Sequence, residues 1–216
     1  MAAFISLEGI DGSGKTTQLR LLERYLQSLG LEVVVAREPG GTEVGETIRQ
    51  LLLNSNTSHL RPLSELLLYY VSRNQNLYEN ILPALEAECW VLCDRYADAS
   101  VAYQGYGRGV DLDVIEYLNR ITIDRHLPDL TLLIDIDPEV GLARARERNR
   151  QYTIDEGRFE KESLEFYNRV RQGYLKIALS APERIRVING RQPIEVVHRQ
   201  ILGIISSLAQ TQSDTT

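Results

Sequence analysis

A glycine-rich stretch near the start of the chain limits the possible folds more than any other feature. Residues 8–17 read EGIDGSGKTT and follow the apolar run AAFISL directly. From Gly9 to Thr16 the stretch fits the pattern G-x-x-x-x-G-K-[ST]. Glycine permits the positive φ angles of such a turn, and it lets backbone N–H groups come close to an anion. The pattern therefore predicts a strand, a phosphate-binding loop and a helix in succession.

The loop also predicts what it binds. The N-terminus of the following helix adds the positive end of its dipole to the backbone N–H groups. We expect the Lys15 side chain to bridge the β- and γ-phosphates of ATP and the Thr16 hydroxyl to bind Mg²⁺. A glycine-rich turn with an incidental lysine is the weaker interpretation, because a chance match in a chain of this size occurs about once in a hundred. The predicted ATP-binding residues of the loop are Gly9, Ile10, Asp11, Gly12, Ser13, Gly14, Lys15, Thr16 and Thr17.

Strand-like and helix-like segments alternate along the rest of the chain. Short apolar runs rich in β-branched residues lie at 4–8, 32–36, 90–94, 130–136 and 185–188. Such continuous apolar strands are typical of a parallel sheet that is covered on both faces. Helical patterns lie at 15–29, 43–54, 63–88, 111–125, 138–149, 160–180 and 193–208. We therefore expect a three-layer α/β fold, with a five-stranded parallel sheet flanked by helices.

The length and the distribution of apolar residues indicate one soluble domain. We expect this domain at 1–209, followed by a disordered polar tail at 210–216. Residues 143–158 are nearly all polar and lie between two helical patterns, which predicts a mobile lid on the surface. The chain has neither 18 consecutive apolar residues nor a basic N-terminal region followed by an apolar stretch. We therefore expect no membrane partner and a cytoplasmic protein.

The charged residues limit the possible partners and reactions of the protein. The net charge of −6 does not favour nucleic acid as a partner. Only three of the 24 basic residues are lysines, and four arginines stand at 144, 146, 148 and 150 in the expected lid. They are either a solvated helix face or cations that close on a phosphate group. A kinase needs such a lid to exclude water, and arginines that arrive on closure are worth roughly 10³–10⁵ in rate. The sequence has no N-K-x-D guanine motif, so a kinase is favoured over a guanine-nucleotide switch, and the fold is expected to be a P-loop kinase fold.

Four further stretches favour a second, acceptor site. REPGG (37–41) follows the second strand, and DRY (94–96) ends the third. Tyr69 and Arg73 stand four residues apart in a helical pattern and so share one face. AYQGYGRG (102–109) is rich in glycine and aromatic residues, and we interpret it as a loop.

Taken together, these stretches resemble the thymidylate kinase family from residue 4 to about residue 180. The likeness rests on REPGGT, on DRY with S-x-A-Y-Q-G, on PDLTLLIDIDPEVGL and on RFEKES-x-x-F-Y-x-x-V-R-x-x-Y. It implies the phosphorylation of dTMP to dTDP with ATP and Mg²⁺, for dTTP synthesis. It also implies a homodimer, in which LSELLLYYV (63–71) would form one helix of the interface.

The resemblance implies roles for residues on the acceptor side. Arg95 of DRY would hold the dTMP phosphate, and Asp94 would lie near Mg²⁺, through water, with Thr16. Tyr69 would stack on thymine, and Arg73 would donate a hydrogen bond to a thymine carbonyl.

Other residues match contacts to the base and the sugar. Ser100 and Gln104 match polar contacts to the base or its surroundings. Tyr103 matches a ring that crowds the ribose 2′ position and so favours deoxy substrates. Asp11 matches an acidic residue that faces the sugar 3′-hydroxyl.

Two residues of REPGG match a segment beside the acceptor phosphate. These are Arg37 and Glu38. Glu38 either touches the ligand or orients Arg37 or Arg95, and both interpretations stay open.

The lid is expected to supply the catalytic arginine. Some members of the family carry it inside the phosphate loop, at the position of Gly12 here, and a loop without it resembles the bacterial subtype. Arg148 is the best match for the lid arginine, with Arg144 nearer the adenine or the α-phosphate. The lid is a few residues longer than the family pattern, so Arg146 and Arg150 remain alternatives. The predicted catalytic residues are Lys15, Arg95 and Arg148.

Two other functions remain open at this point. One is a kinase for another nucleoside monophosphate, such as UMP, CMP or AMP. The other is a nucleotide-dependent regulatory P-loop protein, which would show no dependence on an acceptor.

Overall fold

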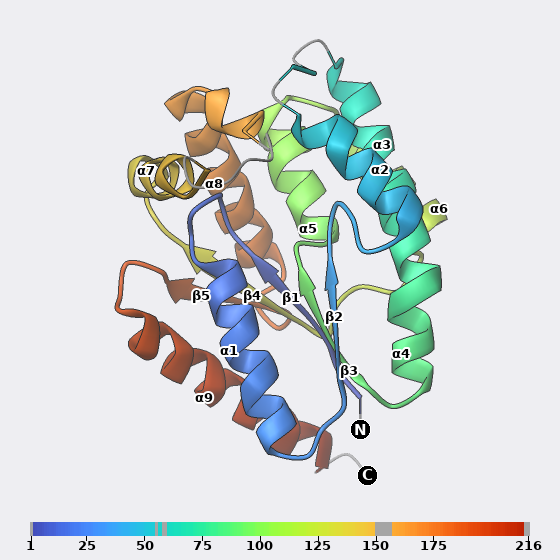
Figure 1. Ribbon diagram of the computed structural model, residues 1–216, viewed down its shortest axis with the longest axis vertical. Helices are drawn as coiled ribbons and strands as arrows, with labels where there is room; N and C mark the ends of the chain where they lie inside the picture. Colours follow the sequence, from blue (N-terminus) through green and yellow to red (C-terminus); the bar gives the residue numbers. More distant parts are fainter. Residues whose placement is uncertain (1, 55, 58–59, 150–156, 214–216) are drawn as a thin grey trace.

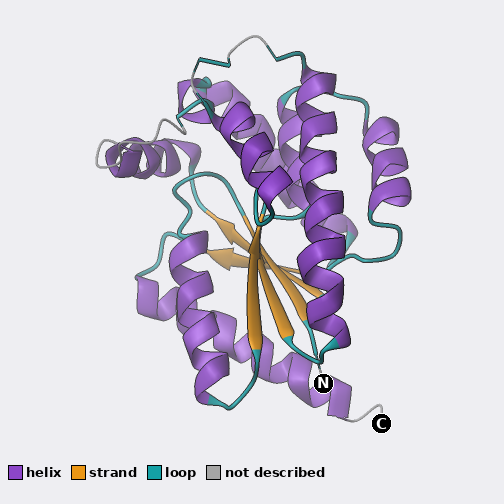
Figure 2. Cartoon of the chain, turned by 45° about the vertical axis from the view of Figure 1, so that its right-hand side comes forward, coloured by secondary structure: helices purple, strands orange, loops and turns teal. Residues whose placement is uncertain are grey.

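The structure is a five-stranded parallel sheet with helices on both faces (Figures 1 and 2). This computed structural model describes residues 2–54, 56–57, 60–149 and 157–213, and it describes only the backbone of 148–149 and 207–213. The strands are β1 (Phe4–Glu8), β2 (Val33–Arg37), β3 (Trp90–Asp94), β4 (Leu130–Asp135) and β5 (Ile185–Asn189). Their order is β2-β3-β1-β4-β5, and every neighbouring pair is parallel. The predicted fold class and all five strands are confirmed, with ends that move by at most one residue.

Helices cover the sheet in two layers. On one face lie α1 (Lys15–Ser28) and α9 (Ile194–Ser213), which contact each other. The main helix against the other face is α8 (Leu164–Ser180). The remaining helices are α2 (Glu43–Leu53), α3 (Pro62–Asn76), the π-helix η1 (Leu77–Ile81), α4 (Leu82–Glu86), α5 (Ala97–Ser100), the π-helix η2 (Val101–Gly107), α6 (Leu112–Thr122), α7 (Pro138–Asn149) and the 3₁₀ helix η3 (Phe159–Lys161).

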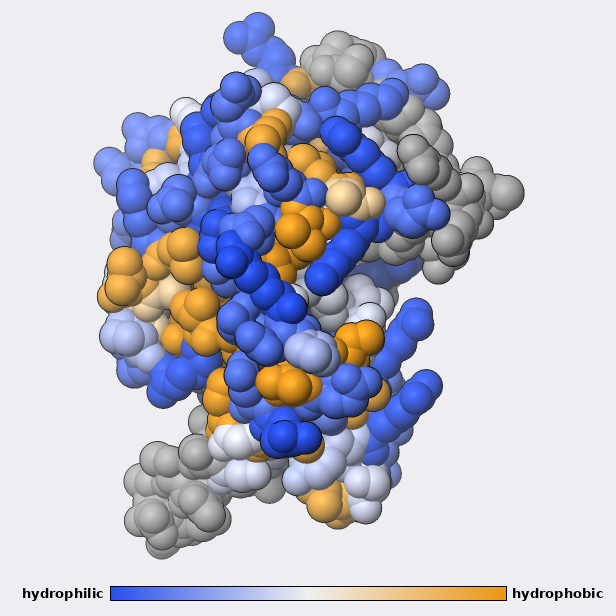
Figure 3. All heavy atoms as spheres, turned by 90° about the vertical axis from the view of Figure 1, so that its left-hand side faces the viewer, coloured by the Kyte–Doolittle hydropathy of each residue, from blue (hydrophilic) through white to orange (hydrophobic). Residues whose placement is uncertain are grey.

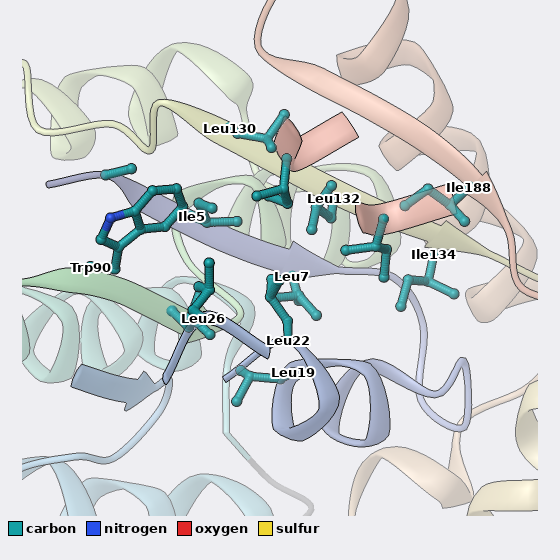
Figure 4. Packing of buried hydrophobic residues seen from close by; sticks show 14 of the residues in the cluster. Ile5, Leu7, Leu19, Leu22, Leu26, Trp90, Leu130, Leu132, Ile134 and Ile188 are labelled. Atoms are coloured by element: carbon teal, nitrogen blue, oxygen red, sulfur yellow. The ribbon is translucent and has the colours of Figure 1, made fainter. Parts of the chain in front are cut away.

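The core beneath α1 fixes where the phosphate loop stands. Leu19, Leu22 and Leu26 follow one another at helical spacing, and all three are buried. They pack on the apolar side chains of β1, β3 and β4, as Figure 4 shows. Since α1 begins at Lys15, directly after the loop, this packing anchors the loop at the carboxyl edge of the sheet.

One local expectation was wrong. Residues 102–109 were interpreted as a loop, but Val101–Gly107 form the π-helix η2, which packs on α8. A Cβ atom at Gly107 would lie 2.7 Å from Cε2 of Phe166, and one at Gly105 would lie 2.6 Å from Cδ2 of Leu112. The two glycines therefore permit close packing of a helix, whereas the sequence pattern had suggested a turn.

Several helix ends differ from the sequence pattern, among them the end of α9, whereas α7 spans the predicted 138–149. The backbone of α9 continues to Ser213, past residue 208, so the expected tail at 210–216 overlaps the last turn of the helix. The first part of the expected lid belongs to α7, which ends at Asn149. Lid residues 150–156 lie outside the described part of the chain. Among the described helices, none combines the length and the apolar character that crossing a membrane requires.

Glycine positions in the helices give a test of this packing. Gly173 of α8 faces Tyr106, and an added Cβ would lie 2.6–2.8 Å from three atoms of that side chain. Gly173→Ala should lower the free energy of unfolding by about 1–2 kcal/mol, because overpacking outweighs the gain in helix propensity. Urea denaturation measures the change.

Gly203 of α9 supplies the matched control. A Cβ atom added there meets no atom of the described residues within 4 Å. Gly203→Ala should therefore raise the free energy of unfolding by about 0.5–1 kcal/mol through helix propensity alone. Equal effects of the two substitutions would contradict the packing of α8 against η2.

Candidate functional site

A single continuous cavity lies at the carboxyl edge of the sheet. Its volume is about 1190 Å³. On one side its wall is formed by the phosphate loop, and on the other by residues that follow β2 and β3 and by side chains of α3 and η2. The cavity is therefore wide enough to bring a nucleotide on the loop together with a second ligand.

The loop has the backbone that its glycines predicted. Gly9, Gly12 and Gly14 have φ angles of 136°, 74° and 99°. Gly12 also meets α7 closely, since a Cβ atom there would lie 2.1 Å from the carbonyl oxygen of Gly141. No other residue type fits at Gly12 without displacing the loop or α7.

Lys15 lies across the loop that it follows. Its Nζ donates to the carbonyl oxygens of Gly9 at 3.0 Å and Ile10 at 2.9 Å. Burial, with a further contribution from the positive charge of Arg95, lowers the pKa of Lys15 to about 8. A bound phosphate group would restore favourable charge around this ammonium.

A hydroxyl and a carboxylate meet where Mg²⁺ is expected. The Thr16 Oγ1 donates to Oδ2 of Asp94 at 2.8 Å, and both residues line the cavity. Oxygen ligands of this kind suit Mg²⁺, which is usually held by one or two protein oxygens together with substrate phosphates. Within the described residues, no group of three or more His, Cys, Asp or Glu side chains forms a metal site. The oxygen pair therefore fits an ion that arrives with the nucleotide.

Arg95 joins the loop to the acceptor side. Its guanidinium donates to the Gly9 carbonyl at 2.8 Å and to Oδ1 of Asp11 at 2.7 Å. Its φ angle is 71°, a left-handed conformation that is uncommon for residues other than glycine. This conformation turns the side chain back from the end of β3 over the loop, and such strain is typical of functional positions.

Tyr103 stands in an aromatic cluster beside Asp11. Its ring meets Phe159 edge-on at 5.6 Å, and its hydroxyl donates to Oδ2 of Asp11 at 3.2 Å. Burial raises the pKa of Tyr103 well above its ordinary value, so the phenol stays protonated. Tyr167 of α8 also donates to Asp11, at 2.8 Å. Sequence reasoning had not singled out Tyr167, although it belongs to the RFEKES-x-x-F-Y stretch.

Buried polar atoms that lack partners occur at two of the residues expected to form the base pocket, of which Ser100 lines the cavity and Arg73 does not. Arg73 is 1% exposed and pairs with Glu38 at 2.7 Å. Its Nη1 atom is buried and has no hydrogen-bond partner within the described part of the chain, and the same holds for Oγ of Ser100. Tyr69, Ser100 and Gln104 all line the cavity. An unpaired buried donor or acceptor is costly, so these atoms point to a ligand that pairs with them.

The two residues of REPGG differ in their contacts. Glu38 lines the cavity but orients Arg73, whereas the sequence had left Arg37 and Arg95 as the arginines it would orient. Arg37 lines the cavity as well and binds both carboxylate oxygens of Glu46, at 2.7 and 2.8 Å. Arg49 of α2 is a lining residue that sequence reasoning missed, because nothing in its helical context marks it.

The arginines of α7 fall on different faces. Arg144 lines the cavity, whereas the Nη2 atom of Arg146 donates to the Glu160 carbonyl at 3.2 Å. Arg148 follows Arg144 by four residues in the same helix, but its side chain lies outside the described part of the chain. Arg150 lies outside it altogether.

Comparison with known proteins gives one family throughout. A family model described as thymidylate kinase matches residues 7–201. The thymidylate kinase of Syntrophotalea carbinolica is 51% identical over 201 residues, which cover 92% of this chain and 93% of the relative. That of Geobacter sp. strain M21 is 52% identical over 196 residues, covering 90% and 87%. The crystal structure of thymidylate kinase from Ehrlichia chaffeensis is 38% identical with a TM-score of 0.77, and the match covers 95% of this chain and 98% of that one.

The lowered pKa of Lys15 predicts proton uptake when ATP binds. Above pH 8 the free protein has lost this proton, and the phosphate charges of ATP favour its return. At pH 9 we expect uptake of up to about one proton per ATP, and little uptake by this group at pH 7. Titration calorimetry in two buffers of different ionisation enthalpy measures it. The control variant Lys176→Met should leave the proton uptake unchanged. If no proton is taken up at pH 9, Lys15 does not have the lowered pKa and the phosphate contact assigned to it.

Proposed function

Because the chain belongs to the thymidylate kinase family and phosphorylates dTMP to dTDP with ATP, we propose that its two nucleotides meet between Lys15 and Arg95. The observation that carries this proposal is the continuity of the cavity from the loop to Tyr69 and Gln104. A separate binding pocket for each nucleotide would not allow direct transfer.

On the donor side, the ATP phosphates would rest on loop residues 9–17. The Lys15 ammonium would move from the loop carbonyls to the β- and γ-phosphates, and the hydroxyl of Thr16 would hold Mg²⁺, with Asp94 acting through water. Bound Mg²⁺ neutralises part of the triphosphate charge. The hydrogen bond between Thr16 and Asp94 supports this arrangement, because it brings the two oxygen ligands to one side of the loop.

On the acceptor side, Arg95 and Arg37 would hold the dTMP phosphate. The thymine would lie on Tyr69 and accept a hydrogen bond from Arg73. The unpartnered Nη1 atom of Arg73 supports this assignment, since a thymine carbonyl would complete its hydrogen bonding. Ser100 would make a further polar contact near the base.

The sugar would lie between Asp11 and Tyr103. Asp11 would accept from the 3′-hydroxyl, and the Tyr103 ring would crowd a 2′-hydroxyl. The aromatic packing around Tyr103 supports this role, because a ring held on several sides does not move aside for a larger sugar.

The chemistry needs cations more than a base. Two phosphate groups repel each other until positive charge lies between them. A general base contributes little, because the transition state of phosphoryl transfer is loose. Lys15 and Arg95 would supply two cations, and arginines of the lid would supply the rest. Arg144 and Arg148 are four residues apart in α7 and so share one face, which supports Arg148 over Arg146.

An exposed apolar stripe supports a homodimer. Leu63, Leu67 and Val71 of α3 are about half exposed, as are Tyr117 and Ile121 of α6. The two helices contact each other and lie on one side of the molecule, away from α7 and α9 (Figure 1). On the face that carries α7 and α9, apolar groups are scattered among hydrophilic side chains (Figure 3). We propose that the α3–α6 stripe is covered by a second copy, and that the dimer works in the cytoplasm without a nucleic acid partner.

A substrate panel tests the function. In a coupled assay of ADP release, dTMP should exceed UMP, CMP and AMP in kcat/KM by at least about tenfold, since the Tyr103 ring would crowd the 2′-hydroxyl that all three ribonucleotides carry. Release of ADP that does not depend on any acceptor would favour a regulatory nucleotide-binding protein. Equal or better use of another monophosphate would identify a different kinase.

Removal of the lid arginine tests the source of the catalytic cation. Arg148→Ala should lower kcat by about 10²-fold with little change in dTMP affinity, because the charge is needed in the transition state. The matched variant is Arg146→Ala, two residues away, and it should have a smaller effect. If Arg146→Ala or Arg150→Ala causes the larger loss, the catalytic role belongs to that arginine.

A further inference from the structure

We propose that Glu65 selects thymine over cytosine by fixing the orientation of the Gln104 side-chain amide. Glu65 would act without touching the substrate, as a positioning residue. The inference rests on the placement of thymine proposed above.

Glu65 is a fully buried carboxylate directly behind the proposed base pocket. It stands on α3, one turn before Tyr69, and its exposed fraction is 0%. It accepts hydrogen bonds from Nε2 of Gln104 at 2.9 Å and Nε of Arg108 at 3.3 Å, and also from Nη2 of Arg158. Gln104 lines the cavity, whereas Glu65 does not. The contact between them therefore joins the cavity wall to a charge buried behind it.

A carboxylate restricts a neighbouring amide to one orientation. The two ends of a glutamine amide have nearly the same shape, but the NH₂ end donates and the carbonyl end accepts. A carboxylate that is paired with two guanidinium groups offers only acceptor atoms. The NH₂ end of Gln104 must therefore face Glu65, and its carbonyl oxygen is left for the cavity.

This orientation matches thymine and opposes cytosine. Thymine offers a donor at N3–H and an acceptor at O4, while cytosine offers an acceptor at N3 and a donor at its amino group. The Gln104 oxygen would accept from N3–H, and Nη1 of Arg73, which can only donate, would reach O4. Cytosine would set acceptor against acceptor and donor against donor, and such mismatches in a buried site discriminate strongly.

A buried carboxylate also holds the other group that would read the base. Arg73 pairs with Glu38 at 2.7 Å, although Glu38 lines the cavity itself and Glu65 does not. A guanidinium donates in any orientation, but an amide can turn. Of Gln104 and Arg73, only Gln104 therefore depends on its carboxylate partner to decide whether it donates to the base or accepts from it.

The test is the relative use of dCMP and dTMP by Glu65→Gln. A glutamine at 65 can accept or donate, so the Gln104 amide is free to turn its NH₂ end toward N3 of cytosine. The ratio of kcat/KM for dCMP to that for dTMP should rise by at least about tenfold. Glu65→Asp, which keeps an acceptor-only group, should hold the ratio nearer the wild-type value than Glu65→Gln does.

Two controls separate this effect from loss of stability. Asp98→Asn alters another buried carboxylate, which is paired with Arg184 and does not line the cavity, and it should leave the ratio unchanged. Glu65→Gln leaves Arg158 without its carboxylate, whereas Arg108 keeps its ion pair with Glu162 at 2.7 Å. The charge-balanced Glu65→Gln/Arg158→Gln variant is therefore measured beside Arg158→Gln alone. The ratio should rise in the double variant and not in Arg158→Gln.

Gln104→Leu separates the role of Glu65 from the placement of thymine beside Gln104. This variant removes the acceptor, so it should raise the dCMP to dTMP ratio whatever orients the amide. If the ratio rises in Gln104→Leu but in neither variant that carries Glu65→Gln, the role of Glu65 is overturned and the thymine placement stands. If Gln104→Leu also leaves the ratio unchanged, the placement of thymine itself is wrong.

Discussion

The guanidinium of Arg95 connects the two halves of the site, and its position depends on a carboxylate beneath it. Glu8, the last residue of β1, accepts from the Tyr96 backbone N–H at 2.7 Å, next to the left-handed turn at Arg95. Glu8 also accepts from the Tyr174 hydroxyl at 2.7 Å, and that hydroxyl accepts from Arg95. Burial, with the nearby Asp98, raises the pKa of Glu8 to about 7. One buried group thus holds the backbone next to the strained arginine and, through Tyr174, its side chain.

The backbones of α7 and the phosphate loop approach each other closely, which links the helix that begins the expected lid to the loop. Gly12 of the loop and Gly141 of α7 stand so close that a Cβ atom on either would meet the other segment within 2.6 Å. A shift of α7 therefore presses on the loop directly, with no intervening side chain to absorb it. The arginines of α7 are carried by the same rigid helix, so cations and phosphate loop are positioned by one contact.

The sequence predicted best those features whose chemistry and geometry leave a single solution. The phosphate loop is one, because the glycines that permit its φ angles are also those that admit a phosphate. The segment at 102–109 was misread because glycine also marks close packing, and only the position of Phe166, far along the chain, decides between turn and contact. The partners of Glu38 and Glu65 were out of reach for the same reason. Each binds residues at least 35 positions away, and no periodicity along the chain encodes such pairs.

The buried carboxylates Glu38, in the cavity wall, and Glu65, behind it, are better explained by the orientation they impose on their partners than by a gain in stability. Removing an ion pair such as Glu38–Arg73 from water is expensive, and replacing one with apolar residues of similar volume is often neutral or stabilising. With an apolar core at these positions, the groups proposed to face the base could adopt other rotamers and another amide orientation. A site that must tell one pyrimidine from another by the direction of its hydrogen bonds cannot allow that freedom. The free-energy cost of burying Glu38 and Glu65 is therefore consistent with a role in base recognition, since apolar residues of similar volume could stabilise the fold equally well.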